Sequence, residues 1–124
     1  MFSPGKTAFL FPGQGSQVVG MGRELAEKSP EAEQVFKAAD QVLGIDLSNL
    51  CWHGPPDELN DTHNTQPALY TCSLAALAAL RAHIGDFAPA FVAGHSLGEI
   101  TALAAMRSLS FEAGLKLVRK RGQL

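Results

Sequence analysis

Gly94-His95-Ser96-Leu97-Gly98 is the stretch that decides the fold of this chain, because a short apolar run precedes it and a helical pattern follows it. A serine between two glycines at such a junction is typical of a nucleophile elbow, a sharp turn from strand to helix that projects the serine hydroxyl. Ser96 is therefore a candidate nucleophile toward an acyl carbon, and the backbone N–H of Leu97 is a candidate oxyanion donor. The same five-residue pattern also occurs in ordinary loops.

Two short apolar runs predict strands. Ala90–Ala93 leads into the elbow, and Thr7–Phe11 ends at Pro12-Gly13, which is a turn signal. The run that ends at Phe11 is apolar from Ala8 onward and therefore predicts a strand that is buried on both faces. The glycines of the loop over residues 13–17 free backbone amides at the end of this strand, where open α/β sheets bind ligands. An oxyanion donor is one use for such an amide.

Capping residues predict the helices. Ser29 and Pro30 open a helix that Gly44 ends, and Ser110 caps a last helix that runs toward Arg121. A further helix is expected from Leu97 to about Met106.

Between these helices, residues 45–65 carry polar turns around one helical turn near residues 47–51, which predicts a surface connection. Pro67 is expected to open a long helix that runs to about His83. Its alanines and leucines leave few polar positions on any face, so this helix is expected to be largely buried.

This order of strands and helices predicts an α/β fold, with a parallel sheet flanked by helices and a nucleophile elbow. The sequence contains only two convincing strands. Parallel sheets normally have several strands with both faces covered. We therefore expect an incomplete catalytic core.

The composition excludes several function classes. The chain has 124 residues, enough for about one domain, and its hydrophobic fraction of 46% is that of a globular protein. A net charge of −2 gives no electrostatic footprint for nucleic acid or an anionic membrane, and the longest apolar run is too short to span a bilayer. Cys51 and Cys72 lack metal or redox spacing and are expected to be buried free thiols. No secretory signal is recognisable, so we expect a cytoplasmic protein.

None of the four histidines is an evident base for Ser96. His95 is adjacent to it, but neighbouring side chains on a sharp turn point apart, so His95 is expected to support the turn. His53 and His63 lie in polar connecting segments, and His83 lies at a helix end where a cation suits the dipole. Each has a structural interpretation.

Four motifs in register give the chain a family resemblance: FPGQGSQ (residues 11–17), TQPA (65–68), GHSLGE (94–99) and RG (121–122). Taken alone, Gln66 is a helix-entry residue, and Arg119 and Arg121 are solvated charges at a helix end. Together the motifs closely resemble the malonyl-CoA:acyl carrier protein transacylases, over nearly the whole chain. Acyltransferase domains of polyketide and fatty acid synthases share most of them. The resemblance implies an acyltransferase core of the patatin-like or hydrolase-like kind.

The resemblance also implies a role for each site residue. Ser96 would accept the acyl group, the backbone amides of Gln14 and Leu97 would form the oxyanion hole, Gln66 would line the active site, and Arg121 would pair with the malonyl carboxylate. Ser96 would take the malonyl group from malonyl-CoA and pass it to the phosphopantetheine thiol of acyl carrier protein. No metal or redox cofactor is implied.

The chain also departs from the family. Family members are considerably longer, and their catalytic histidine follows a small inserted subdomain. We therefore expect residues 1–124 to be the N-terminal part of the large α/β subdomain, without the inserted subdomain and the later strands, and to transfer malonyl groups poorly or not at all when alone. A serine esterase or acylhydrolase, which would use water as the acceptor, and a non-catalytic fragment that complements a second chain remain alternatives. The sequence leaves open the pathway, the acyl range and the oligomeric state.

Overall fold

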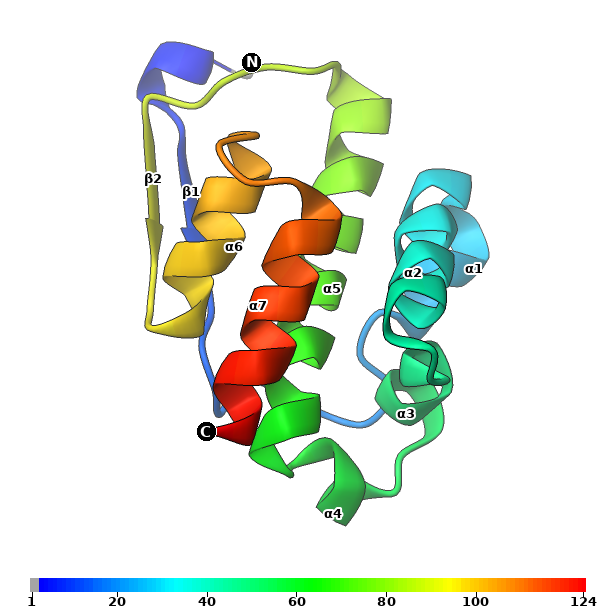
Figure 1. Ribbon diagram of the computed structural model, residues 1–124. Helices are drawn as coiled ribbons and strands as arrows, with labels where there is room; N and C mark the ends of the chain where they lie inside the picture. Colours follow the sequence, from blue (N-terminus) through cyan, green and yellow to red (C-terminus); the bar gives the residue numbers. More distant parts are fainter. Residues whose placement is uncertain (1–2) are drawn as a thin grey trace.

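A two-stranded parallel sheet lies beside a group of packed helices (Figure 1). The computed structural model describes residues 3–124. The elements follow in the order η1 (Pro4–Lys6), β1 (Ala8–Phe11), α1 (Arg23–Lys28), α2 (Pro30–Leu43), α3 (Leu47–His53), α4 (Pro56–Leu59), α5 (Thr62–Ile84), β2 (Phe91–Gly94), α6 (Leu97–Ala105) and α7 (Phe111–Gln123). No helix in this described range is long and apolar enough to cross a membrane.

Within residues 3–124, helices cover only one face of the sheet. Strands β1 and β2 pair in parallel, and α6 lies across one face with α5 beside it (Figure 1). Phe9 and Phe11 are buried on this covered face, whereas Leu10 and Phe91 are each 76% exposed on the other. The prediction of a strand buried on both faces is therefore wrong. An unbroken apolar run fits a covered strand, but the run itself does not specify what covers it.

The main core lies around α5, which packs between α2 and α7. Its largest fully buried side chain is Tyr70, whose hydroxyl donates a hydrogen bond to the Phe111 carbonyl at 2.8 Å. Burial raises the pKa of this hydroxyl. A Cβ on Gly114 would lie 2.2 Å from the Tyr70 oxygen, so only glycine allows α7 to approach α5 this closely.

The predicted caps are confirmed. The Ser29 hydroxyl accepts from the Ala32 N–H at 3.2 Å, and the Ser110 hydroxyl accepts from the Ala113 N–H at 3.1 Å. Gly44 ends α2 with a φ of 66°, in the left-handed region that favours glycine. The helical turn expected near residues 47–51 is part of α3. The short helices α1 and α4 were not predicted.

Helix α5 begins at Thr62, so the prediction that Pro67 opens it is wrong. Pro67 lies inside the helix, where it has no N–H to donate to the carbonyl of His63 one turn earlier. That carbonyl instead accepts from Arg119 Nη1 at 2.9 Å. The helix is buried from Thr65 to Thr71 and again at Ala75 and Leu77, but its C-terminal end is exposed, so the expected burial does not extend to its last two turns.

The two cysteines are free, as predicted, with Cys51 fully buried and Cys72 half-buried. Burial raises the pKa of the Cys51 thiol to about 12.

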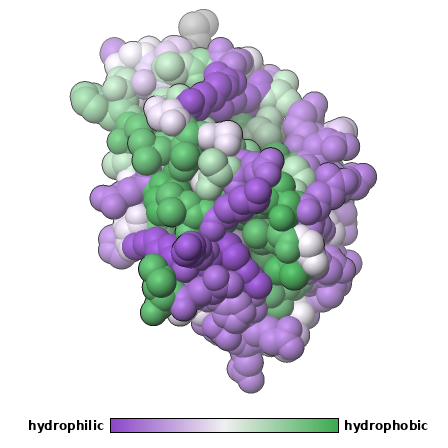
Figure 2. All heavy atoms as spheres, viewed as in Figure 1, coloured by the Kyte–Doolittle hydropathy of each residue, from purple (hydrophilic) through white to green (hydrophobic). Residues whose placement is uncertain are grey.

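Figure 2 shows hydrophilic side chains along α7, with hydrophobic surface on both sides of them. Leu103 of α6 and Leu117 of α7 are among the exposed apolar residues.

Candidate functional site

Ser96 occupies the turn between β2 and α6, as the elbow pattern predicts. Its φ of 56° and ψ of −108° place a serine in a region that side chains rarely adopt. The flanking glycines permit this turn. A Cβ on Gly94 would lie 2.0 Å from the backbone of Gly98, and a Cβ on Gly98 would lie 2.3 Å from the Phe11 carbonyl oxygen. Neither position accepts a larger residue, so close packing fixes the strained turn.

Arg121 joins Ser96 to Gln66. Its Nη2 donates to the Ser96 hydroxyl oxygen at 2.7 Å, and its Nη1 donates to Gln66 Oε1 at 3.0 Å. The three side chains come from the elbow, α7 and α5, which are far apart in sequence. Gln66 is 7% exposed and Arg121 is half-buried. A guanidinium has five N–H donors, so Arg121 keeps donors for an anionic ligand beside the Ser96 hydroxyl.

The two predicted oxyanion donors lie where the ends of the strands meet. Leu97 is the first residue of α6, and a helix supplies no acceptor of its own for the N–H at this position. Gln14 follows Gly13, where an added Cβ would lie 2.4 Å from the His95 carbonyl oxygen. The His95 N–H in turn donates to the Phe11 carbonyl at 3.1 Å. The loop after β1 therefore packs directly against the elbow.

Two amide side chains connect this loop to the start of α5 and to the turn just before it. Gln14 Nε2 donates to Thr62 Oγ1 at 3.2 Å, and Gln17 Nε2 donates to Asn60 Oδ1 at 2.9 Å. The Oε1 of Gln17 also accepts from the Gly15 N–H at 2.8 Å. No role for Gln17 or Asn60 follows from the sequence alone, although Gln17 ends the FPGQGSQ motif. Its place in that motif was the available signal.

Arg119 is a second arginine with tertiary contacts, and its sequence-based interpretation is wrong. It was interpreted as a solvated charge, but it is half-buried and bonded to α5. Its Nη1 donates to the His63 carbonyl at 2.9 Å and to Asn64 Oδ1 at 2.6 Å. The same interpretation of Arg121 is wrong for the same reason, because tertiary contacts occupy both guanidinium groups.

None of the four histidines within residues 3–124 is hydrogen-bonded to Ser96. His63 Nδ1 lies 2.7 Å from Asp61 Oδ1, and His53 and His83 are exposed. The ring of His95 lies against Gly13, where an added Cβ would be 2.8 Å from its Nδ1. This contact agrees with the expectation that His95 supports the turn. The described residues thus present a serine without a histidine base in contact.

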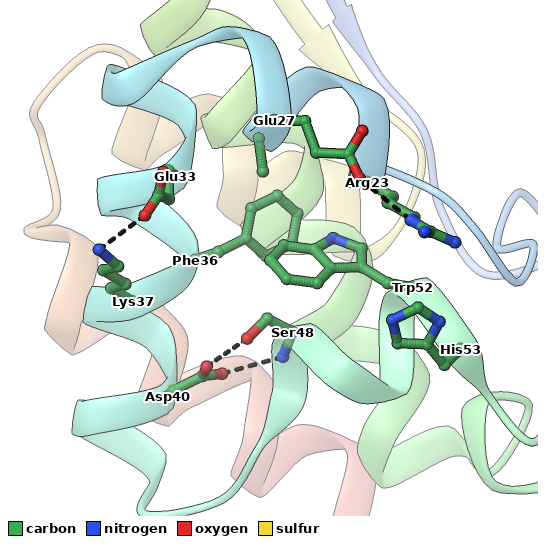
Figure 3. A pocket seen from close by; sticks show the side chains of 10 residues that line it. Arg23, Glu27, Glu33, Phe36, Lys37, Asp40, Ser48, Trp52 and His53 are labelled. Carbon is green, nitrogen blue, oxygen red and sulfur yellow. Dashed lines mark hydrogen bonds and ion pairs between the residues drawn. The ribbon is translucent and has the colours of Figure 1, made fainter.

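A cavity of about 500 Å³ lies elsewhere, between α1, α2 and α3 (Figure 3). The rings of Phe36 and Trp52 meet at its centre, with their centroids 5.2 Å apart. Its charged side chains are engaged in pairs: Arg23 with Glu27 at 3.2 Å, Lys37 with Glu33 at 2.6 Å, and Asp40 with Ser48. None of the predicted site residues lines it.

The described residues also contain no cluster of three or more His, Cys, Asp or Glu side chains that could hold a metal ion. Three of the site residues predicted from the sequence, Ser96, Gln66 and Arg121, therefore lie together at the elbow.

Known proteins are similar to this chain in sequence and in fold. The malonyl CoA-acyl carrier protein transacylase of Bacillus subtilis is 50% identical over 118 residues, which are 95% of this chain and 37% of that protein. A crystal structure of the acyl-carrier-protein-S-malonyltransferase from Bartonella henselae matches with a TM-score of 0.91 and 42% identity, covering 95% of this chain and 38% of that one.

A third match is the structure of a type II PKS acyl-carrier protein in complex with its malonyl-transacylase, with a TM-score of 0.89 and 45% identity over 95% of this chain and 38% of that one. The chain thus spans well under half the length of these relatives, and its helices and small parallel sheet share the fold of malonyltransferases. The model of the acyl transferase domain matches residues 8–124. This chain therefore belongs to the acyl transferase domain family.

Proposed function

We propose that this chain carries the serine side of an acyltransferase that moves malonyl groups from malonyl-CoA to the phosphopantetheine thiol of an acyl carrier protein. The observation that carries the proposal is the contact between Arg121 and the Ser96 hydroxyl, with 2.7 Å between their polar atoms. A malonyl group differs from an acetyl group by a terminal carboxylate. A fixed cation beside the nucleophile is therefore suited to select it.

In the first half-reaction, Ser96 Oγ attacks the thioester carbonyl carbon of malonyl-CoA. The Oγ–C bond forms, the C–S bond breaks, and CoA leaves with the proton that Ser96 loses. The backbone N–H groups of Leu97 and Gln14 stabilise the negative charge on the carbonyl oxygen in the transition state. In the second half-reaction, the carrier thiol attacks the malonyl-serine ester, and Ser96 recovers its proton. The acyl group is transferred without a change of oxidation state, so we propose that no metal or redox cofactor takes part.

Arg121 would hold the malonyl carboxylate, while Gln66 would fix the orientation of its guanidinium. A planar guanidinium offers paired N–H groups that match a carboxylate in a bidentate arrangement, which lysine does not. Gln66 is buried and accepts from Nη1, so it limits the directions in which the guanidinium can turn. The partner proposed for the transfer is an acyl carrier protein, and the complex formed by a similar malonyl-transacylase supports this choice.

We further propose that residues 1–124 correspond to the N-terminal part of the large subdomain of such an enzyme, with a hydrolase-like or patatin-like core. The uncovered sheet face and the match to 37–38% of the relatives support this assignment. Proton removal from Ser96 needs a base, and no histidine in the described residues contacts it. We therefore expect the chain alone to acylate Ser96 slowly and to transfer malonyl groups poorly or not at all.

Intact-mass spectrometry of the chain incubated with malonyl-CoA tests this proposal. We expect slow formation of one malonyl group per chain, which is absent from Ser96→Ala and is removed at most slowly when a phosphopantetheinylated carrier protein is added. Rapid return to the unmodified mass in water alone would instead indicate an acylhydrolase. No acylation at any time would contradict the proposal and favour a non-catalytic fragment.

A further inference from the structure

We infer that Arg119 is a positioning residue, which fixes the last turn of α7 against the start of α5 so that Arg121 reaches Ser96. This inference rests on the proposed function for its consequence, but not for its geometry. It concerns a side chain that touches neither Ser96 nor Gln66 and is bonded instead to His63 and Asn64.

The need for Arg119 begins with Pro67. A helix interior normally pairs the carbonyl of residue 63 with the N–H of residue 67, but proline has no N–H. The His63 carbonyl would therefore be left without a donor inside the helix, and an unsatisfied polar group at a partly buried site is costly. Arg119 Nη1 donates to this carbonyl at 2.9 Å. A charged donor from α7 thus replaces the missing bond of α5 and joins the two helices.

The same contact holds the part of α7 that carries Arg121. Val118 is the last fully buried side chain of α7, and Leu124 is 99% exposed. Between them, the last turn touches α5 through Arg119, through Arg121 and at Gly122, where a Cβ would lie 2.6 Å from His63 Cα. Helix ends fray unless such contacts hold them. Arg119 is therefore a cross-link that helps to hold this turn, and with it Arg121, beside Ser96.

Replacement of Arg119 should change acyl selectivity rather than the nucleophile itself. In Arg119→Met, the last turn gains freedom and Arg121 loses its fixed position, whereas Ser96 and the amide of Leu97 stay on β2 and α6. We expect the rate of Ser96 acylation by malonyl-CoA to fall by about 10-fold to 100-fold, as for other displaced binding groups. The rate with acetyl-CoA should change by less than about twofold, because acetyl has no carboxylate for Arg121 to hold.

Lys120→Met is the matched control. Lys120 is an exposed cation on the same helical turn and makes no hydrogen bond or ion pair within the described part of the chain. Lys120→Met should leave the acylation rates with malonyl-CoA and with acetyl-CoA unchanged. Arg119→Lys keeps a charged donor within reach of His63 and should recover part of the malonyl rate. If Arg119→Met lowered the acylation rates with malonyl-CoA and acetyl-CoA by the same factor, Arg119 would have a merely structural role and the inference would be overturned.

Pro67→Ala supplies a second test. Alanine restores the N–H that pairs with the His63 carbonyl, so Arg119 is needed less. Arg119→Met should then reduce malonyl selectivity by a smaller factor in the Pro67→Ala background than in the original chain. The same factor in both backgrounds would overturn the proposed action through the His63 carbonyl.

A nuclear magnetic resonance measurement separates this inference from the proposed function. The side-chain Nε–Hε signal of Arg121, assigned with Arg121→Met, should shift and exchange faster with water in Arg119→Met but not in Lys120→Met. If no chain is acylated while this signal moves, the proposed function fails and the positioning role stands. An unmoved signal would overturn the positioning role, whatever the acylation rates.

Discussion

Ser96 is held with φ at 56°, a conformation that a serine adopts only when its surroundings impose it. The packing of Gly94 and Gly98 imposes it here, since neither has room for a Cβ. In this turn the hydroxyl reaches the guanidinium of Arg121. At the scale of single residues, the site therefore combines backbone strain with a charge-assisted hydrogen bond.

This strain predicts that Ser96→Gly is more stable than Ser96→Ala. Both variants lose the hydroxyl, but only glycine adopts this backbone conformation without a steric cost. We expect the free energy of unfolding to be about 1 kcal/mol higher for Ser96→Gly than for Ser96→Ala. Urea denaturation of the two variants measures this difference. Equal midpoints would contradict the account of a strained elbow.

The buried thiol of Cys51 predicts a pH dependence. Its pKa is raised to about 12 from 9.0, so the folded state favours the protonated form. Stability from this group is full below pH 9.0 and is lost as the pH rises toward 12. In Cys51→Ala, the free energy of unfolding should fall less steeply over this range. The raised pKa values of Cys72 and Tyr70 should leave part of the slope. Parallel pH profiles would show that Cys51 does not titrate in this way.

At the scale of helices and strands, the close packing of α7 on α5 sets the position of Arg121. Glycines mark this contact near both ends of α7, Gly114 against Tyr70 and Gly122 against His63. Between them, Leu115 and Val118 are fully buried. Glycine at positions 114 and 122 therefore allows the close spacing between α7 and α5.

Gly114→Ala should accordingly destabilise the chain, although alanine favours helix formation. The added Cβ would lie 2.2 Å from the Tyr70 oxygen, and overpacking of this kind costs about 1–3 kcal/mol, against a gain in helix propensity of about 1 kcal/mol. We expect a lower thermal midpoint. Gly5→Ala is the control, since nothing lies within 4 Å of its added Cβ. A higher midpoint for Gly114→Ala would show that the helices separate at little cost.

Local signals in the sequence were sufficient to predict most elements and the elbow. Ser29, Gly44 and Ser110 act through neighbouring backbone groups, so their effect can be predicted from a few adjacent residues. The start of α5 could not be predicted in this way. Pro67 removes a hydrogen bond of the helix, and Arg119, a residue distant in sequence, supplies a replacement. Gln66 and Arg121 were predicted from the family resemblance, and Gln17 belongs to one of its motifs, whereas the role of Arg119 depends on contacts with residues that are distant in sequence.

At the scale of the whole molecule, the sheet face that α6 does not cover exposes large apolar side chains. Leu10 and Phe91 are each 76% exposed there. Exposed apolar patches favour association, so the chain should self-associate at high concentration. Leu10→Thr with Phe91→Thr should reduce this association in sedimentation velocity and change the free energy of unfolding by less than about 1 kcal/mol. Unchanged sedimentation would show that another surface mediates association.

The central claim is that Arg121 makes Ser96 a malonyl-accepting serine. The most direct test is the ratio of Ser96 acylation rates with malonyl-CoA and acetyl-CoA, measured by intact mass in single turnovers, for the original chain and for Arg121→Met. A hydrogen-bonded ion pair contributes about 1.5–3 kcal/mol, so we expect a ratio of about 10-fold to 100-fold in the original chain. In Arg121→Met the ratio should fall to about one. A ratio that Arg121→Met leaves unchanged would contradict the claim.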